Sequence, residues 1–275
     1  MPAVVFPAPW TSIHRVDPRF PHHLVNADGQ HLFILNKTGW AYFGCQDPEG
    51  YLKRAKEEGI TVIRVALEGR PYWDTLHIDI WPFGGTREKP DYASFNGDVW
   101  DRIEERVKLA GRYGIGLDII LFHDLHPRSE EVERLKPYVR EAVRRLGRYT
   151  NVLCWELQNE WLQNEAFQDQ VGPLLRELDP LRPVITSDHT ADNAAWPHKP
   201  WVGMATTHTC TGSGNGPYTL AGWYLPVARN TRSHDKPAWC SESGREKRHK
   251  NDDGVHRRKQ GWIWYAAGCY WTWHT

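Results

Sequence analysis

The sequence has no excess of charge of either sign and no apolar run long enough to cross a bilayer. Its 34 Lys and Arg residues balance 34 Asp and Glu residues, and this balance argues against nucleic acid or a membrane surface as the main partner. The first ten residues lack the basic start and apolar core of a signal peptide. We therefore expect a cytoplasmic protein, or a secreted one if a leader has been removed.

Several functional motifs are also missing. The five cysteines form no close-spaced pair, and we interpret them as buried free thiols. No Gly-x-Ser-x-Gly pattern surrounds Ser241 or Ser243, which disfavours a serine hydrolase. His123 and His126 could suggest a metal, but hydrolytic metal barrels draw ligands from several strands, and the first expected strand has no His-x-His pair. We expect no metal and no cofactor.

The order of apolar segments predicts an α/β fold. A chain of 275 residues has the size of a parallel barrel with one core. We predict a (β/α)8 TIM barrel forming one catalytic domain over residues 1–275, with 1–21 as an irregular arm and an Asp28-Gly29 hairpin closing the bottom. The last strand is not followed by an eighth helix in this sequence. The expected strands are residues 32–35, 61–67, 115–122, 152–157, 183–186, 201–207, 238–240 and 268–273.

Two of the expected strands end in glutamates. The run at 150–163, TNVLCWELQNEWLQ, passes from apolar strand residues to Asn159 and Glu160, and KPAWCSESG at 236–244 places Glu242 between two serines. The carboxyl ends of parallel barrel strands form the catalytic face. Glycoside hydrolysis needs two carboxylates flanking one bond, one to protonate the leaving oxygen and one to attack the anomeric carbon or activate water. A single strand-end glutamate is more often a helix cap or a solvated charge, so the pair is the informative feature.

The run W-E-L-Q-N-E at 155–160, with W-C-S-E at 239–242, resembles glycoside hydrolase clan A. Within that clan, the sequences at 25–43 and 98–121 are similar to cellulase-like and apiosidase-like barrels. The resemblance implies a retaining enzyme with Glu160 as general acid/base after the fourth strand and Glu242 as nucleophile after the seventh. It also implies that Asn159 binds the sugar 2-hydroxyl.

Arg64 lies inside the apolar second strand, where an unpaired guanidinium would be very costly. One interpretation is a structural salt bridge to a core acid such as Glu156. The other, which the resemblance supports, is that Arg64 contacts Glu242 and keeps it ionised. We favour the second interpretation.

Histidines and tryptophans supply the remaining candidate substrate-binding residues. His123 and His208 end the third and sixth strands, where the clan often places site residues, although either could be structural. Fifteen tryptophans exceed the need of a core, and indole faces stack on sugar rings. Trp73 and Trp81 lie in the long segment 68–96, which we interpret as a wall of a sugar cleft or as a small aromatic core of its own. Trp271 matches the stacking tryptophan that the clan often has on strand eight.

The sequence therefore predicts a retaining glycoside hydrolase that acts on a β-linked glycan or glycoside. An inactive carbohydrate-binding barrel is the main alternative, and a serine or metal-dependent hydrolase is less favoured. The sugar, the linkage, exo or endo action and the oligomeric state do not follow from the sequence.

Overall fold

A sheet of eight parallel strands forms the centre of the computed structural model, which describes residues 2–69, 78–188, 193–209, 220–243 and 254–273. The strand order is β10-β11-β12-β3-β4-β7-β8-β9. A parallel bridge between Val184 in β9 and Val202, just before β10, joins the two ends of the sheet. The sheet is thus nearly closed, as predicted for a TIM barrel. The strands are β3 (Leu35–Thr38), β4 (Val62–Ala66), β7 (Gly116–Phe122), β8 (Val152–Gln158), β9 (Val184–Ile185), β10 (Ala205–His208), β11 (Ala238–Glu242) and β12 (Tyr270–Trp273).

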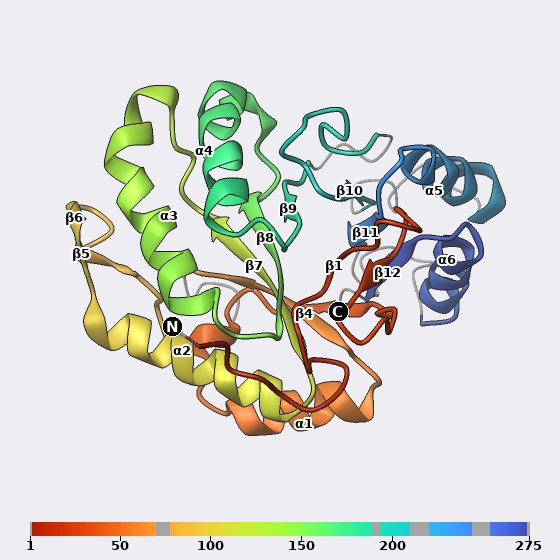
Figure 1. Ribbon diagram of the computed structural model, residues 1–275, viewed down its shortest axis with the longest axis horizontal. Coiled ribbons are helices and arrows are strands. Elements are labelled where there is room, and N and C mark those ends of the chain that lie inside the picture. The colour runs from red at the N-terminus through yellow and green to blue at the C-terminus, as the bar shows by residue number, and fades with distance from the viewer. Residues whose placement is uncertain (1, 70–77, 189–192, 210–219, 244–253, 274–275) are drawn as a thin grey trace.

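Helices lie outside the sheet and alternate with its strands (Figure 1). The Asp47 side chain accepts a hydrogen bond from the Gly50 amide and Pro48 occupies the first helical position, so these two residues fix the start of the first helix. The helices are α1 (Pro48–Glu57), α2 (Gly97–Arg112), α3 (Val132–Leu146), α4 (Glu165–Leu178), α5 (Leu225–Arg232) and α6 (Gly254–Ala266). Short 3₁₀ turns occur at Tyr42–Gly44, Ser129–Glu131 and Leu162–Asn164, and a π-helical turn at Leu220–Tyr224 precedes α5.

Two expected strands are displaced in the structure. The first barrel strand begins at Leu35 rather than residue 32, because Leu32 instead donates its amide to Leu24 in the N-terminal hairpin. The sixth begins at Ala205 rather than residue 201, because the amide of Val202 turns back to the carbonyl of Lys199. A proline inside a helical sequence pattern predicts a break, but α3 continues through Pro137. Pro137 lies within the first turns of α3. It has no backbone N–H to donate to the carbonyl of Glu133, but Glu133 is exposed.

The N-terminal arm and hairpin pack against the amino-terminal end of the barrel. Trp10 is fully buried, donates its indole N–H to the carbonyl of Gly114, and lies so close to Gly116 that a side chain there would clash with the indole. Strands β1 (Arg15–Val16) and β2 (Leu24–Val25) pair antiparallel, and a second turn with Gly29 at φ 78° returns the chain to Leu32. This arrangement confirms the predicted Asp28-Gly29 hairpin, whereas Arg15 and Val16 form a strand within the segment that was predicted to be irregular.

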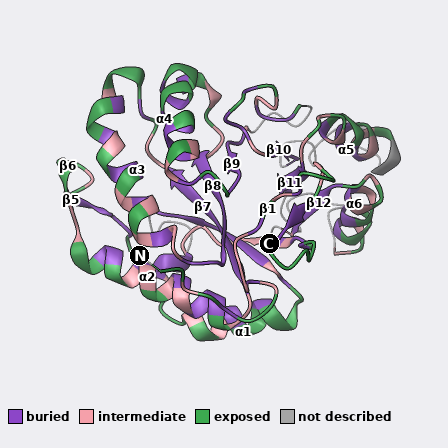
Figure 2. Ribbon diagram, viewed as in Figure 1, coloured by how far each residue is buried: buried purple, intermediate pink, exposed green. Residues whose placement is uncertain are grey.

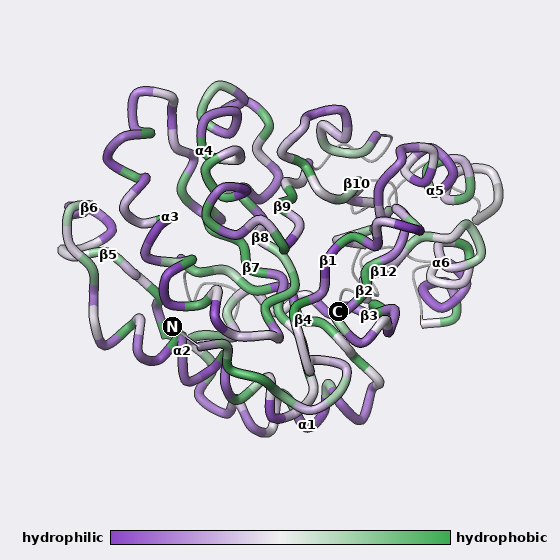
Figure 3. Tube along the Cα trace, viewed as in Figure 1, coloured by the Kyte–Doolittle hydropathy of each residue, from purple (hydrophilic) through white to green (hydrophobic). Residues whose placement is uncertain are grey.

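The long segment after β4 contains an antiparallel pair, β5 (Phe83–Gly85) and β6 (Pro90–Phe95). The Phe83 ring packs 4.6 Å from the Tyr138 ring of α3, so this hairpin is attached to the outside of the barrel. Buried residues follow the strands, and the exposed ones lie mainly on the helices (Figure 2). The hydropathy of the chain has the same pattern (Figure 3). None of the helices among the described residues is long and apolar enough to span a membrane.

Candidate active site

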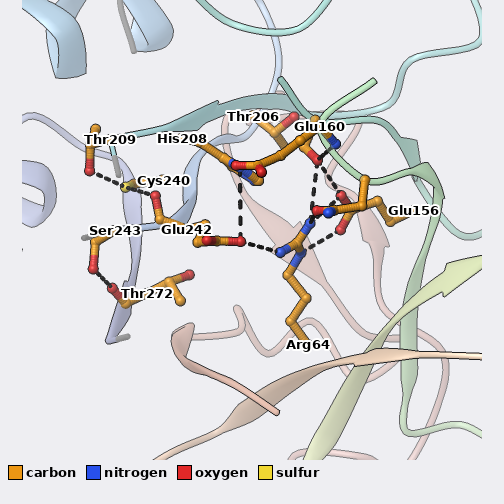
Figure 4. Close-up of polar contacts among 12 residues, drawn as sticks. Arg64, Glu156, Glu160, Thr206, His208, Thr209, Cys240, Glu242, Ser243 and Thr272 are labelled. Carbon is orange, nitrogen blue, oxygen red and sulfur yellow. Dashed lines mark hydrogen bonds and ion pairs between the residues drawn. The ribbon is translucent and has the colours of Figure 1, made fainter. Parts of the chain in front are cut away.

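Three barrel strands place Glu160, His208 and Glu242 at one carboxyl-terminal edge. Glu160 follows β8, His208 ends β10 and Glu242 ends β11. His208 Nδ1 lies 2.7 Å from Glu160 Oε1 and 4.0 Å from Glu242 Oε2. One donor atom from each of the three side chains lies within 4.8 Å of the other two. The two predicted carboxylates are therefore close together, with the His208 ring beside both (Figure 4).

The two carboxylates differ in exposure. The Glu160 side chain is 29% exposed and the Glu242 side chain only 7%. Glu160 has φ +48°, a left-handed conformation that is uncommon for a residue with a side chain. Its amide donates to the Ser187 hydroxyl, which holds this turn against the end of β9. The backbone thus directs Glu160 toward the open end of the barrel, while Glu242 stays inside.

Arg64 makes both of the contacts that the sequence suggested, the favoured one with Glu242 and the structural one with Glu156. Its Nε and Nη2 atoms donate to the two oxygens of Glu156, both at 2.6 Å, and Nη1 donates to Glu242 Oε2 at 2.7 Å. Nη2 also donates to Asn159 Oδ1 at 2.7 Å. Figure 4 shows the guanidinium lying between the Glu156 and Glu242 carboxylates. The structural salt bridge fixes the plane of the same guanidinium that reaches Glu242.

Burial opposes ionisation of these groups, but their mutual attraction is stronger. Arg64 is fully buried, yet the negative charges of Glu156, Glu242 and Asp118 raise its pKa above the usual range. Burial also opposes charge on Glu156, but Arg64 lowers its pKa, with further help from His208 and the Ser187 hydroxyl. The Arg64–Glu156 pair is therefore ionised beneath the site.

Asp118 is a further buried acid near this pair, and sequence reasoning did not single it out because it lies within an apolar strand. Its Oδ2 atom is 3.7 Å from Arg64 Nε, and Cys154 Sγ lies 3.1 Å from Oδ1. Burial and the neighbouring charge of Glu156 raise the pKa of Asp118 well above its usual range. The cluster thus holds a carboxyl group that binds its proton more tightly in the folded chain than in the unfolded chain.

This difference predicts a pH dependence of stability. The Asp118 proton stabilises the fold at low pH, and this contribution is lost as pH rises from about 4 through the raised pKa. We expect Asp118→Asn to lose less stability than the wild type over that range. Urea denaturation at several pH values measures the difference, and parallel curves for the two proteins would contradict the assignment.

Glu68 organises the loop that follows β7. Its Oε1 atom accepts hydrogen bonds from the amides of His123, Asp124 and Leu125 at 2.6, 2.6 and 2.9 Å. Burial raises the pKa of Glu68, although His123 and the Leu125 amide favour its charged form. The sequence did not identify Glu68 as a residue of the site, because the three backbone amides that donate to it leave no sequence motif. The contact positions His123 at the rim, with the Trp40 ring 5.8 Å away.

The predicted tryptophans have different surroundings, and Trp73 lies outside the described residues. Trp81 is 6% exposed and packs against Phe83 and the Arg87 guanidinium, at 5.0 and 4.8 Å. Trp271 is 2% exposed and packs against Gly261 of α6, so its ring lies on the outer side of β12. The structure does not bring either indole to the two glutamates. Their contacts favour a packing role.

Packing of Trp271 predicts a large loss of stability when it is shortened. Trp271→Ala should lower the free energy of unfolding by about 3 to 5 kcal/mol, because it removes a buried ring and leaves a cavity. Chemical denaturation measures this loss. Unchanged stability together with weaker sugar binding would instead support the predicted stacking role.

Within the described residues, one group of side chains has donor atoms close enough together to bind a metal ion, and it consists of Glu160, His208 and Glu242. The Arg64 guanidinium already contacts Glu242 at 2.7 Å. Its positive charge would repel a divalent cation held by that carboxylate. The donor set is therefore better suited to proton and glycosyl chemistry than to a resident metal.

Comparison with solved structures places this fold among glycoside hydrolases. A Bacteroides vulgatus ATCC 8482 protein described as a "putative glycoside hydrolase" superposes with TM-score 0.74 and 20% identity, covering 96% of this chain and 54% of that one. A glycoside hydrolase family 5 protein from the same organism has TM-score 0.74 and 16% identity, covering 100% and 64%. The endo-1,4-beta-D-mannanase of Thermotoga petrophila RKU-1 has TM-score 0.66 and 16% identity, covering 88% of each chain. The present chain spans about half to two thirds of the two Bacteroides proteins.

Sequence comparison identifies the family more directly. No curated protein matches the chain significantly. A family model described as "Apiosidase-like, catalytic domain" matches residues 20–268, which include Arg64, Glu160, His208 and Glu242. The chain belongs to the apiosidase-like catalytic domain family.

Proposed function

We propose that this protein is a retaining glycoside hydrolase that cleaves a β-linked glycan or glycoside. The observation that supports this best is the close approach of Glu160 and Glu242, whose nearest oxygens lie within 4.8 Å. Retaining enzymes hold their carboxyl groups about 5 to 5.5 Å apart, whereas inverting enzymes leave about 6.5 to 9.5 Å for a water molecule. This spacing leaves room for a sugar carbon but not for a water between carbon and carboxylate.

Glu242 is the proposed nucleophile. It is nearly buried and accepts a 2.7 Å hydrogen bond from Arg64 Nη1, which holds the carboxylate in one orientation. Its oxygen would form a bond to the anomeric carbon as the bond to the leaving oxygen breaks. The glycosyl-enzyme ester is then cleaved by water.

Glu160 is the proposed general acid and base. It is partly exposed and shares a 2.7 Å contact with His208, so its proton can be delivered to the leaving oxygen and replaced from water. Asn159 is the proposed contact for the sugar 2-hydroxyl. Because Arg64 occupies its Oδ1 atom, the amide NH₂ is oriented to donate to the sugar.

A panel of aryl β-glycosides, including pyranosides and furanosides, tests the proposal and identifies the sugar. We expect one sugar class to be cleaved, with activity lost in Glu160→Gln and Glu242→Gln. Glu57→Gln is the matched control, since Glu57 is exposed at the end of α1. Binding of glycosides without cleavage would support the inactive carbohydrate-binding alternative.

A further inference from the structure

The residue that follows Glu160 presents an aromatic surface at the rim of the site. Trp161 is 36% exposed, and its ring lies 4.2 Å from the His126 ring at an interplanar angle of 30°. Other exposed large apolar side chains, such as Trp262 at 72%, lie elsewhere on the described surface. An indole with one face supported by a second ring has its other face available for a ligand.

Buried side-chain amides hold the two rings in place. Gln168 donates to the Trp161 carbonyl at 3.0 Å and to Asn164 Oδ1 at 2.7 Å. Asn164 donates to the Pro127 carbonyl and to Gln158 Oε1, both at 3.1 Å. Gln158 in turn donates to the Leu125 carbonyl at 3.0 Å. These bonds join the segments on both sides of His126 to the segment that contains Trp161.

The burial of this network has a consequence for binding. Gln158 and Gln168 are fully buried and Asn164 is 8% exposed, so breaking these bonds would leave buried amides unpaired. The ring pair is therefore held before any ligand arrives, and less conformational entropy is lost when one binds.

The strands that precede His126 and Trp161 indicate on which side of the scissile bond this ring pair lies. In the strand order, β7 and β11 lie on opposite sides of the barrel. His126 follows β7 and Trp161 follows Glu160 after β8, whereas Glu242 ends β11. Glu242 attacks one face of the anomeric carbon, and the leaving group departs toward the acid on the other side. The segment that carries Trp161 accordingly lies on the side of the acid, toward which the leaving group departs.

We propose that Trp161, supported by His126, binds the leaving group by stacking on a ring with one apolar face. Both a further sugar ring and an aromatic aglycone have this chemistry. The inference rests on the proposed function, since it assigns a side of the same site. It adds a specificity-determining residue to the two glutamates.

The test compares leaving groups within one variant. For the sugar that the panel identifies, specificity constants are measured for an aryl glycoside, a disaccharide and the glycosyl fluoride, whose leaving group has no ring. For each substrate with a ring in its leaving group, we consider the ratio of its specificity constant to that of the fluoride. We expect Trp161→Ala to lower this ratio by about 10-fold or more, consistent with the loss of one aromatic stack. Trp161→Phe should keep each ratio within about threefold of the wild type, and Trp262→Ala should change none of the three constants.

Each outcome is distinct because a ratio within one protein is independent of the folded fraction. A fall confined to the aryl glycoside assigns the site to aromatic aglycones, and a fall that includes the disaccharide assigns it to rings in general. An equal loss on all three substrates, or an unchanged ratio, would overturn the inference while leaving the glycosidase proposal intact. A wild-type protein that cleaves none of them would overturn the proposed function itself.

Discussion

Glu242→Ala should lose activity on the order of 10⁴-fold or more, even on substrates with very good leaving groups. A good leaving group removes the need for an acid but not the need for a nucleophile. Azide should partly restore turnover by entering the space that the carboxylate vacates, and the product should be the glycosyl azide of opposite anomeric configuration. The product configuration can be read by NMR.

Glu160→Ala should behave differently on the same substrates. Aryl glycosides with poor leaving groups should slow by about 10² to 10⁴-fold, because they require protonation. Those with very good leaving groups should still form the glycosyl-enzyme, and azide should then speed turnover to a β-azide product. If azide gives these outcomes with the two variants exchanged, the assignment is reversed, and if neither variant loses activity the glycosidase proposal is wrong.

Arg64→Met should lower the free energy of unfolding by about 3 to 5 kcal/mol, because it leaves the buried Glu156 carboxylate without a counter-charge. For a chain of this size, that corresponds to a fall in Tm of roughly 10 °C. Calorimetry measures the change. Arg182→Met is the matched control for activity, since Arg182 is also buried and paired, with Asp179, away from the two glutamates.

A double variant separates the structural and functional contacts of Arg64. Arg64→Met with Glu156→Gln should recover part of the lost stability, because no uncompensated charge remains at position 156. It should not recover activity, because Glu242 then lacks the Arg64 hydrogen bond that orients it. Recovery of activity together with stability would mean that Arg64 acts only through the fold.

Much of this site could be predicted from strand ends. Glu160 and Glu242 each follow a short apolar run, and parallel strands bring such positions to one edge whatever the details of packing. Arg64 was also recognisable, because a charge inside an apolar strand must be paired. Its actual arrangement depends on three strands at once, β4, β8 and β11, and no local pattern records that geometry.

Other features depend on the directions in which side chains point, which the sequence does not determine. Trp271 packs outward because of the register of β12 beside β3, and a shift of one residue would have reversed the direction of its side chain. Glu68 binds backbone amides of residues 123–125, and backbone donors have no residue signature. The Trp161–His126 stack depends on an amide network between two loops 35 residues apart in sequence (161 minus 126).

The most direct measurement is to trap the glycosyl-enzyme. A 2-deoxy-2-fluoro glycosyl fluoride of the preferred sugar should slow both steps but form the ester, because its leaving group departs readily while the 2-fluorine destabilises the transition states. Mass spectrometry of the intact protein should show the mass of one added sugar, and peptide mapping should locate it on Glu242. The label should be absent in Glu242→Gln and present in Glu57→Gln. A label on another residue, or steady turnover of the reagent with inversion and no adduct, would contradict the account.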